Sequence, residues 1–441
     1  MKNKFAQHIQ ANFPEFATNK ILVAVSGGLD SVVLLHLLHQ LNFDVIIAHC
    51  NFNLREKDAD LDEDFVRNIG EKLNIPTLVK SFNTNEFTKK NKLSIQEAAR
   101  KLRYDWFNEL IVNNQADLLV TAHHLNDNFE TVLHHLTRGT GLTGLLGIPS
   151  KNKNTYRPLL AFTRKEIKQF ANENNITWRE DKSNAQTKYI RNKIRHKVLP
   201  VLQEINPNLL HSFSKTLAHL TEANAVLQEQ IVQKWQEVSS VKNKIIQVDI
   251  QKLKQLSNVD FYLYNFFKPF GFNDVSEIKK LLYTQSGKQL FSAKYRLLKD
   301  RKFLLLDTIS IKKEEHFSLT EENEQLITDF FRLKIEINPE NTEIYSDKEK
   351  KSILIDKDLL KFPLTVRKWQ KGDYFYPSKM QGKKKLSKFF KDNKLNLFEK
   401  EKVWVLLSDT KIVWVIGIRQ DKRFSVTKTT KNKVKISFER R

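Results

Sequence analysis

Residues 26–31 have the sequence Ser-Gly-Gly-Leu-Asp-Ser, whose residue types suit a loop that binds phosphate groups. An apolar run at 21–25 predicts a buried strand before the loop, and an apolar helical pattern follows Ser31. The two glycines allow a tight turn whose backbone N–H groups can approach a polyanion. A phosphate at the start of the helix would also meet unpaired N–H groups and the positive end of the dipole. We therefore predict a nucleotide phosphate site here.

Two other interpretations of this loop have to be weighed. No lysine follows the glycines, so the loop is not the Walker type that grips a terminal phosphate. An ordinary glycine turn would explain Gly27 and Gly28 alone. Ser26 before them, Asp30 and Ser31 after them, and the strand-to-helix context favour phosphate binding.

A second group of polar residues lies at 121–131, directly after another apolar run. On a helix that begins near Leu125, Asp127 and Glu130 are three residues apart and share a face, and His124 can lie on the same side as Asp127. Two carboxylates beside a triphosphate could hold Mg²⁺ or receive a positively charged substrate group. Soft ligands are too few for a zinc site. An acidic first turn that only complements the helix dipole remains an alternative on these residues alone.

The elements that position these residues alternate in type from residue 21 to about 175. Short apolar runs lie at 45–48, 77–80 and 118–121, and helical patterns lie near 31–41, 60–73, 95–113, 126–136 and 164–174. This alternation predicts an α/β fold with a doubly wound parallel sheet. Ligands bind at the carboxyl ends of such strands, so the loop at 26–31 and the segments after residues 48 and 121 should converge.

The rest of the chain changes character twice. A long amphipathic helix at 212–238, helices near 259–268 and 275–283, and strand-like runs at 288–297 and 302–308 predict a mainly helical middle domain with a hairpin. The charged segment 312–325 is expected to be a linker or exposed loop. Short β-like runs at 344–345, 364–366, 403–407, 412–418 and 434–438 predict a small α+β module. The expected domains are 1–211 for ATP binding and catalysis, 212–311 in the middle, and 326–441 as a basic C-terminal domain.

Composition limits the class of protein. With 441 residues the chain is too long for one ordinary core. Its 74 Lys and Arg against 51 Asp and Glu give a net charge of +23, which predicts a polyanionic partner, with nucleic acid ahead of a membrane. A genome that favours Lys codons would explain part of this excess. The only cysteine, Cys50, excludes a disulfide or a cysteine-based metal cluster within one chain. No apolar run approaches the length of a membrane span, so we expect a cytoplasmic protein.

Basic residues are concentrated at 361–394, where only Asp373 and Asp392 oppose them. Aromatic side chains are interleaved with the basic ones, at Tyr374, Tyr376, Phe389 and Phe390. This pattern predicts a surface that contacts RNA phosphates. The alternative is a solvated lysine face without a partner.

Residues 26–31 match the SGGxDS loop of the PP-loop ATP pyrophosphatase superfamily. Together with Ala122-His-His-x-x-Asp-x-x-Glu-Thr131, this loop resembles the paired signature of the tRNA(Ile)-lysidine synthetase family. The resemblance extends in order over nearly the whole chain. Its further pieces are Glu97-Ala-Ala-Arg-Lys-Leu-Arg-Tyr104, Arg138-Gly139, Gly141-Leu-Thr-Gly144, Arg157-Pro-Leu159, Glu180-Asp-Lys-Ser-Asn184, Arg191-Asn-Lys-Ile-Arg195, Arg367-Lys-Trp-Gln-Lys-Gly-Asp373, Pro377, Gly382-Lys-Lys-Lys-Leu-Ser-Lys388 and Trp414-Val-Ile-Gly-Ile-Arg419.

The resemblance implies a C–N ligase that acts on RNA. ATP would activate C2 of the wobble cytidine in an isoleucine tRNA with the anticodon CAU, and pyrophosphate would leave. The ε-amine of free L-lysine would then replace the adenylated oxygen, and AMP would leave. The product, lysidine, pairs with A rather than G, so the tRNA changes from methionine to isoleucine identity. Such chemistry needs activation because an amide-like oxygen is a poor leaving group and AMP is a good one.

The resemblance also implies roles for individual residues. The ATP site would comprise Ser26, Gly27, Gly28, Leu29, Asp30 and Ser31. Asp30 and Asp127 would be the catalytic carboxylates, with Asp30 helping to hold Mg²⁺ and Asp127 placed either to bind the metal as well or to take a proton from the lysine amine. Glu130 would bind the substrate ammonium, and Arg191 and Arg195 would bind phosphate or the lysine carboxylate. For both arginines a surface charge on a helix is an equal alternative.

Contacts to tRNA are expected from basic residues of the C-terminal module, namely Arg367, Lys383, Lys384, Lys385 and Lys388. Arg100, Arg103 and Tyr104 are further candidates, although Tyr104 could simply pack on its helix. The expected partners are tRNA(Ile) and free L-lysine, without a membrane, and a homodimer is an open alternative to a monomer.

One departure and three rival functions accompany the resemblance. Family members often carry His-x-Asn-His-x-Leu-Arg-Gly after the second strand, where this chain has His49-Cys-Asn-Phe-Asn-Leu-Arg-Glu56, with Phe52 in place of the second histidine. tRNA thiolases depend on cysteines that a chain with Cys50 alone does not supply. GMP and argininosuccinate synthetases share the loop but leave the basic module unexplained. A non-catalytic RNA-binding protein would not need Asp30, Asp127 and Glu130 intact.

Overall fold

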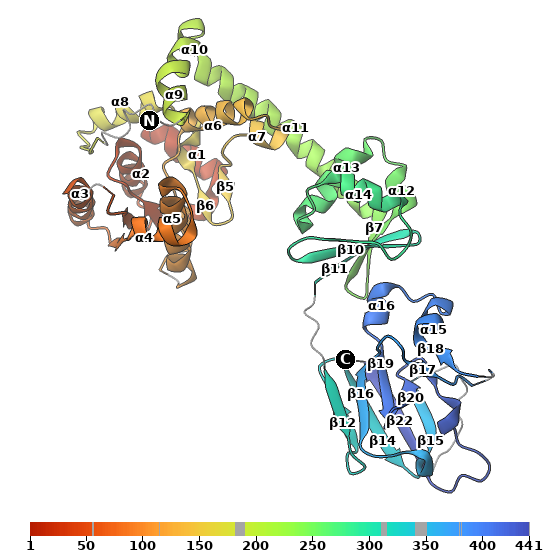
Figure 1. Cartoon of the computed structure of the whole chain (residues 1–441). Helices are drawn as coiled ribbons and strands as arrows, with labels where there is room; N and C mark the ends of the chain where they lie inside the picture. Colours follow the sequence, from red (N-terminus) through yellow and green to blue (C-terminus); the bar gives the residue numbers. More distant parts are fainter. Residues whose placement is uncertain are drawn as a thin grey trace. The chain divides into compact units, whose positions relative to one another are not determined.

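The computed structural model describes residues 1–54, 57–113, 115–180, 190–309, 315–339, 351–378, 380 and 382–440. The chain forms two compact units, Met1–Gln228 and Glu229–Arg441 (Figure 1). In the part of the chain that the structure describes, no helix combines the length and apolar character needed to cross a bilayer.

The N-terminal unit is built on a six-stranded sheet with the order β3-β2-β1-β4-β6-β5. Its strands are β1 Ile21–Ala24, β2 Val45–Asn51, β3 Thr77–Ser81, β4 Leu118–Val120, β5 Lys151–Asn152 and β6 Thr155–Tyr156. All neighbouring strands pair in parallel except β5, which pairs antiparallel with β6. The predicted doubly wound parallel sheet is confirmed, with β1 in its interior.

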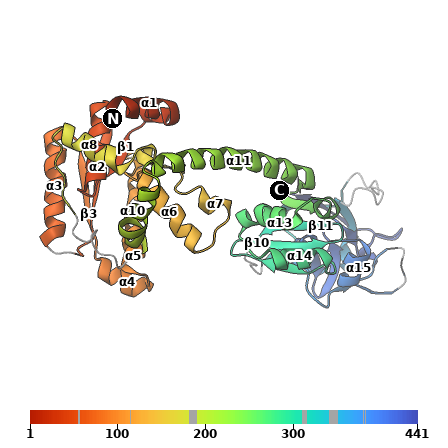
Figure 2. The ribbon, with the colours of Figure 1, turned by 90° about the horizontal axis from the view of Figure 1, so that it is seen from above.

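Helices connect these strands. Their bounds are α1 Lys2–Asn12, α2 Leu29–Gln40, α3 Lys57–Leu73, α4 Thr84–Asn91, α5 Ile95–Val112, α6 Leu125–Thr137, α7 Leu142–Leu145, α8 Arg164–Glu173, α9 Ile190–Lys193 and α10 Leu199–Ile205, with short helical turns at η1 Pro14–Ala17, η2 Pro158–Ala161 and η4 Ile194–Val198. Figure 2 shows α1 and α5 on opposite sides of the sheet. A layer of helices on each face is expected for a parallel sheet.

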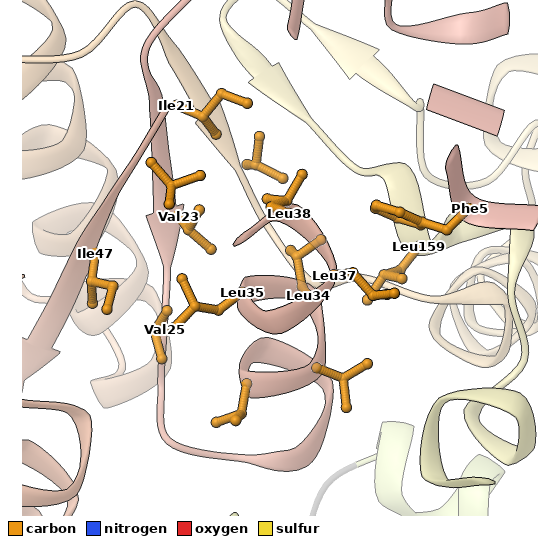
Figure 3. Close-up of a cluster of buried hydrophobic side chains, with 14 of the residues drawn as sticks. Phe5, Ile21, Val23, Val25, Leu34, Leu35, Leu37, Leu38, Ile47 and Leu159 are labelled. Atoms are coloured by element: carbon orange, nitrogen blue, oxygen red, sulfur yellow. The ribbon is translucent and has the colours of Figure 1, made fainter. Parts of the chain in front are cut away.

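Strand periodicity explains the two layers. Ile21 and Val23 point into a core formed with α1, α2, α3 and α8, whereas Leu22 packs against Trp106 and Phe107 of α5 on the other face. Helix α2 is the most deeply buried helix of the first core, and Leu34, Leu35, Leu37 and Leu38 all contribute to it (Figure 3). The loop that joins β1 to α2 is therefore carried by two buried elements.

Helix α11, Leu209–Val238, confirms the predicted long amphipathic helix and contains the division between the two units. After it, residues 239–309 form the middle region of the C-terminal unit. Its elements are β7 Ser239–Lys242, β8 Ile245–Asp249, α12 Ile250–Lys254, α13 Val259–Phe267, η5 Lys268–Phe270, α14 Val275–Tyr283, β9 Gln289–Phe291, β10 Tyr295–Asp300 and β11 Phe303–Thr308. The predicted helices and the β10–β11 hairpin are present. The hairpin belongs to a five-stranded sheet, β7-β8-β11-β10-β9. The strand-like run predicted at 288–297 is divided into β9 and the start of β10, and β7 and β8 were not predicted.

The terminal region, residues 315–440 where described, contains a five-stranded sheet β12-β16-β19-β20-β21 and a four-stranded sheet β13-β14-β22-β15 over a shared core. The bounds are β12 His316–Leu319, β13 Gln325–Ile327, β14 Phe331–Ile337, β15 Ser352–Asp356, η6 Lys357–Leu359, β16 Leu364–Lys368, β17 Tyr374–Phe375, β18 Lys384–Lys385, α15 Leu386–Asp392, α16 Leu397–Glu401, β19 Trp404–Ser408, β20 Lys411–Val415, β21 Arg419–Gln420, η7 Lys422–Phe424 and β22 Lys433–Arg440.

One prediction about this region is wrong. The segment 312–325 was expected to be a linker or exposed loop, but residues 316–319 form β12, which pairs antiparallel with β16. The strand is held because Leu319 is fully buried in the shared core and Phe317 packs against it. The predicted run at 344–345 lies outside the described residues.

The two regions of the C-terminal unit contact each other through α16. Phe398 is fully buried against Ile245, Leu298 and Leu305. The guanidinium of Arg296 donates a hydrogen bond of 2.6 Å to Glu401 and lies 4.1 Å from the centre of the Phe398 ring. The three-domain division expected from the sequence stays a prediction.

Candidate active site

The loop between β1 and α2 is shaped by its glycines and serine hydroxyls. Gly27 has a φ of +86°, a left-handed conformation that a residue with a Cβ adopts only under strain. The Ser31 hydroxyl accepts the N–H of Ser26 at 3.1 Å and donates to the Gly28 carbonyl at 2.9 Å. These bonds fold the chain back on itself at the point where the helix begins.

Neighbouring segments hold the loop on both sides. The Gly27 carbonyl accepts the N–H of Arg179 at 3.0 Å, and the N–H of Val25 donates to Ala48. His49 is buried at the end of β2, and its Nδ1 lies 2.8 Å from the Val25 carbonyl oxygen. Burial lowers the pKa of His49, so the neutral ring donates this bond from Nδ1.

Gly28 is the N-cap of α2 and offers no side chain to the first N–H groups of the helix. The first turn of a helix leaves such groups without partners inside the helix, and the dipole is positive there. The predicted phosphate loop therefore has the backbone arrangement expected of an anion site at the carboxyl end of β1.

His124 brings the two predicted catalytic carboxylates together. It is the N-cap of α6, and its Nδ1 accepts the N–H of Asp127 at 3.2 Å while the Asp127 carboxylate accepts the N–H of His124 at 3.0 Å. Its Nε2 lies 3.6 Å from a carboxylate oxygen of Asp30. The side chain is only 2% exposed, so one buried ring contacts both acids.

Charges in this cluster shift its pKa values. Burial opposes the charged ring, but the hydrogen bond to Asp30 and the charge of Asp127 raise the pKa of His124. Burial likewise opposes ionisation of Asp30, but His124 and more distant arginines lower the pKa of that carboxyl. Because Nδ1 accepts the Asp127 N–H, the neutral ring carries its proton on Nε2, which faces Asp30.

Arg195 joins the second pair of predicted residues. Its Nε and a terminal nitrogen donate to the two oxygens of Glu130 at 2.7 and 3.0 Å, and the same terminal nitrogen donates to Asp127 at 3.1 Å. The Glu130 side chain is 3% exposed, so its charge depends on this guanidinium. Burial opposes the charge of Arg195, but Glu130 and Asp127 raise the pKa of its guanidinium. Arg195 lies in the π-helical turn η4, a feature often found at functional sites.

The other N-terminal arginine candidates lie outside this cluster. Arg191 is exposed on α9, and among the described residues no ion pair connects it to Asp127 or Glu130. Arg100 and Arg103 are exposed on α5, with guanidinium carbons 4.8 Å from the ring centre of Tyr104 and 5.2 Å from that of Phe52.

Phe52, which replaces a common family histidine, has a packing role. Its ring stacks on Phe82 at 5.7 Å between centres and 19° between planes. It belongs to the partly buried surroundings of the α5 core. Arg55 and Glu56, which follow it in the motif, and residues 181–184 of a later motif lie outside the described residues.

Asp30 and Asp127 are the residues of this cluster that could hold a Mg²⁺ ion together with substrate phosphates. One carboxylate oxygen of Asp30, Oδ1, is buried and has no hydrogen-bond partner among the described residues. The described residues contain no group of three or more His, Cys, Asp or Glu arranged for a metal. Mg²⁺ commonly takes one or two carboxylates, with substrate phosphates and water as its other ligands. Asp30 and Asp127 supply that number.

The predicted tRNA-binding residues divide into two kinds. Arg367 forms a two-fold ion pair with Asp373 at 2.8 and 2.9 Å, and Lys384 pairs with Asp392 at 2.7 Å. Lys383, Lys385 and Lys388 are exposed. Their ammonium groups are thus the better placed of the five to meet RNA phosphates.

Sequence reasoning missed the connecting roles of three residues. His124 was expected on the same side as Asp127, but neither its position as the N-cap of α6 nor its contact with Asp30 was predicted, and histidine is not among the residues that N-cap positions prefer. His49 and Arg179 support the phosphate loop from distant segments. These two contacts could not be predicted from local sequence, because they depend on the order of strands in the sheet.

Comparisons with known proteins identify the family to which this chain belongs. Family models described as "PP-loop domain", "TilS substrate binding domain" and "TilS substrate C-terminal domain" match residues 1–202, 241–309 and 364–436. The chain is 36% identical to the tRNA(Ile)-lysidine synthase of Bacteroides thetaiotaomicron over 438 residues, which is 98% of each chain. It is 37% identical to that of Parabacteroides distasonis over 95% of each chain. Among solved structures, a U34-tRNA thiolase NcsA from Methanococcus maripaludis is similar over 50% of this chain and 79% of its own, with 17% identity and a TM-score of 0.42, a likeness too weak to support an argument. On the near-complete match to curated relatives, this chain belongs to the tRNA(Ile)-lysidine synthase family.

Proposed function

We propose that this protein attaches L-lysine to C2 of the wobble cytidine in tRNA(Ile) with a CAU anticodon, and that it uses ATP and releases AMP and pyrophosphate. Family membership supports this reaction. The structural observation that carries it is the cluster in which His124 contacts Asp30 of the phosphate loop and Asp127 of α6. The loop proposed to bind ATP therefore lies beside two carboxylates, one of which could accept a proton from an amine.

In the first step, the O2 atom of the cytidine attacks the α-phosphorus of ATP, the bond to the β-phosphate oxygen breaks, and pyrophosphate leaves. The loop at 26–31 and the first turn of α2 bind and orient the phosphates through their N–H groups. Mg²⁺ held by Asp30 and Asp127 would offset negative charge on the phosphates. His124 keeps both carboxylates in place for that task.

In the second step, the ε-amine of lysine attacks C2, AMP leaves with the former O2 atom, and the amine loses a proton. The amine must be neutral to attack, so a carboxylate has to accept its proton, and Asp127 is one quarter exposed at the edge of the cluster. Arg195 can bind the α-carboxylate of lysine through Nη1, because its bonds to Glu130 and Asp127 use Nε and Nη2. Glu130 is already bonded to Arg195, so a substrate ammonium would share this carboxylate with the arginine.

The proposal extends to partners. Exposed Lys383, Lys385 and Lys388 support tRNA binding by the terminal region. Cys50, the only cysteine of the sequence, is half-buried, and desolvation raises the pKa of its thiol to about 12, which disfavours the sulfur chemistry of a thiolase. The cytoplasmic location expected from the sequence stays a prediction, and a homodimer stays an open alternative.

Labelled lysine tests the proposal directly. The full chain should transfer label to tRNA(Ile) bearing CAU only when ATP is present, with one AMP and one pyrophosphate per lysine. Nucleoside analysis should find lysidine at the wobble position. Hydrolysis of ATP without labelled tRNA, or tRNA binding without ATP use, would instead support another PP-loop activity or an RNA-binding module.

Exposed lysines of the terminal region should control the salt dependence of tRNA binding. Replacing Lys383, Lys385 and Lys388 by alanine should reduce the slope of log affinity against log salt by about 2 to 3, because each phosphate contact contributes slightly less than one. The measurement is a titration of tRNA at several salt concentrations. Alanine at Lys411, Lys428 and Lys431, which are exposed in the same region, removes equal charge and serves as the control. Equal slopes for the two triple variants would mean that 383–388 is only a solvated surface.

A further inference from the structure

The middle region carries a cavity of about 350 Å³ that the proposed chemistry does not use. Its lining consists of Ile250, Gln251, Lys254, Gln255, Arg301 and Lys302. They come from α12 with the residue after it, and from the turn between β10 and β11. Three lining residues are cations, two are amides and none is acidic, so the cavity suits an anion that also has hydrogen-bonding groups.

Two of the cations are held in place. The Lys254 ammonium lies 3.8 Å from the ring centre of Tyr283. The backbone N–H of Arg301 donates to the Ser286 hydroxyl at 2.8 Å, and its guanidinium donates to the Lys394 carbonyl at 3.0 Å. A solvated lysine face would show no such fixation. Pre-ordered side chains lose less conformational freedom when a ligand binds.

A buried cation next to the cavity adds to its positive field. Lys299 is 8% exposed, and its ammonium donates to the carbonyl of Arg301 at 3.0 Å. Burial, reinforced by the nearby charge of Lys254, lowers the pKa of Lys299. The neighbouring acids do not line the cavity: Asp249 caps the N–H groups of Gln251 and Lys252, and burial raises the pKa of Asp300.

An aromatic surface adjoins the cations. Tyr283 ends α14 and is 71% exposed although it is a large ring, and Lys254 covers only one of its faces. Bases that are not paired stack on such rings, and basic groups beside the ring bind the attached phosphate. The cations of the cavity suit the phosphate of a nucleotide, and the adjoining ring suits its base.

We propose that this cavity binds a single unpaired nucleotide of the tRNA substrate, with its phosphate on Lys254, Arg301 and Lys302 and its base stacked on Tyr283. The amides of Gln251 and Gln255 supply hydrogen bonds to the base edge or the ribose. The inference rests on the proposed function because it takes tRNA as the ligand. RNA is favoured over a free nucleotide because the chain carries a net charge of +23 and an RNA strand can engage both this cavity and other basic surfaces.

The test measures tRNA(Ile) affinity of the full chain by titration. Tyr283→Ala should weaken binding at least about fivefold, and Tyr283→Phe should bind like the unchanged protein, because stacking needs only the ring. Phe291→Ala is the matched control, since Phe291 is 63% exposed in the same region and pairs with Arg296, five residues before the cavity residue Arg301. Lys254→Ala combined with Lys302→Ala should reduce the salt slope by about 1 to 2.

Abasic tRNAs identify the nucleotide. Removing the base at each unpaired position in turn should reveal one position at which Tyr283→Ala causes no further loss. Equal tRNA affinity of Tyr283→Ala and the unchanged protein overturns the inference. It is also overturned if Tyr283→Ala weakens the binding of every abasic tRNA as much as it weakens the binding of intact tRNA. Binding of AMP that requires Lys254, with unaltered tRNA binding, would also overturn it and indicate a free-nucleotide site. Lysidine formation by the unchanged protein is measured alongside, so failure of the reaction itself is distinguished from failure of this site.

Discussion

Asp127→Asn is expected to lower the rate of lysidine formation at least about a thousandfold and to leave tRNA affinity within about twofold. Removal of a general base alone commonly costs 10²- to 10⁴-fold, and this change also removes a charged ligand for Mg²⁺. Asparagine can still accept the N–H of His124 and keep α6 capped, so the fold should survive. Asp30→Asn should have a similar effect through the phosphate loop.

Single-turnover assays with labelled lysine, together with tRNA titrations, check this expectation. Asp105→Asn is the matched control, because Asp105 is an exposed acid of α5 that pairs with Lys101 at the surface. Its rate should stay within about twofold of the unchanged protein. A parallel loss of tRNA affinity in Asp127→Asn would contradict the separation of the RNA-binding surface from the acidic cluster.

Arg195→Met should destabilise the N-terminal unit by about 3–5 kcal/mol and abolish measurable lysidine formation. The reason is that Glu130 is almost fully buried and receives both of its ion-pair hydrogen bonds from this guanidinium. Breaking a buried pair by removing one partner leaves an uncompensated charge. Asp127 loses a partner as well, but it is partly exposed and can be solvated. Urea denaturation followed by circular dichroism measures the loss.

A double variant separates stability from activity. Arg195→Met with Glu130→Leu replaces the buried pair by apolar groups and should recover most of the lost stability, because such replacements are often neutral. Activity should stay absent, since the proposed lysine-binding groups are gone. Lys197→Ala removes an exposed cation from the same π-helical turn and should change neither stability nor fold. If the double variant is as unstable as Arg195→Met, the buried charge is not the cause of the destabilisation.

The β1–loop–α2 segment could be predicted because its signals are local. Apolar residues at 21–25, glycines at the turn and an apolar helix after Ser31 all point to one conformation, and the structure has it. The same holds for α6, whose predicted start at Leu125 agrees with the structure. Convergence of Asp30 and Asp127 followed from a general property of parallel sheets, namely that ligands meet the carboxyl ends of the strands.

Contacts between distant segments could not be predicted in the same way. Arg195 was equally compatible with a surface charge, because its partners Asp127 and Glu130 lie more than 60 residues earlier in the chain. Strand β12 was missed because only Phe317 and Leu319 mark it within a strongly charged segment. Arg367 and Lys384 were expected at an RNA surface, but Asp373 and Asp392 already pair with them. In each case a partner distant in the sequence determines the position of the residue or strand, and local composition does not identify that partner.

One consequence follows from the capping position of His124. Since the ring that contacts Asp30 also closes the first turn of α6, correct folding of that turn already fixes the spacing of the acids. In a flexible site the two carboxylates would have to be brought into position in each catalytic cycle. Here they are positioned once, when the protein folds. Substitution of His124 is correspondingly restricted by chemistry: an asparagine oxygen could accept the N–H of Asp127 and cap α6, but the short side chain could not also reach the Asp30 carboxylate.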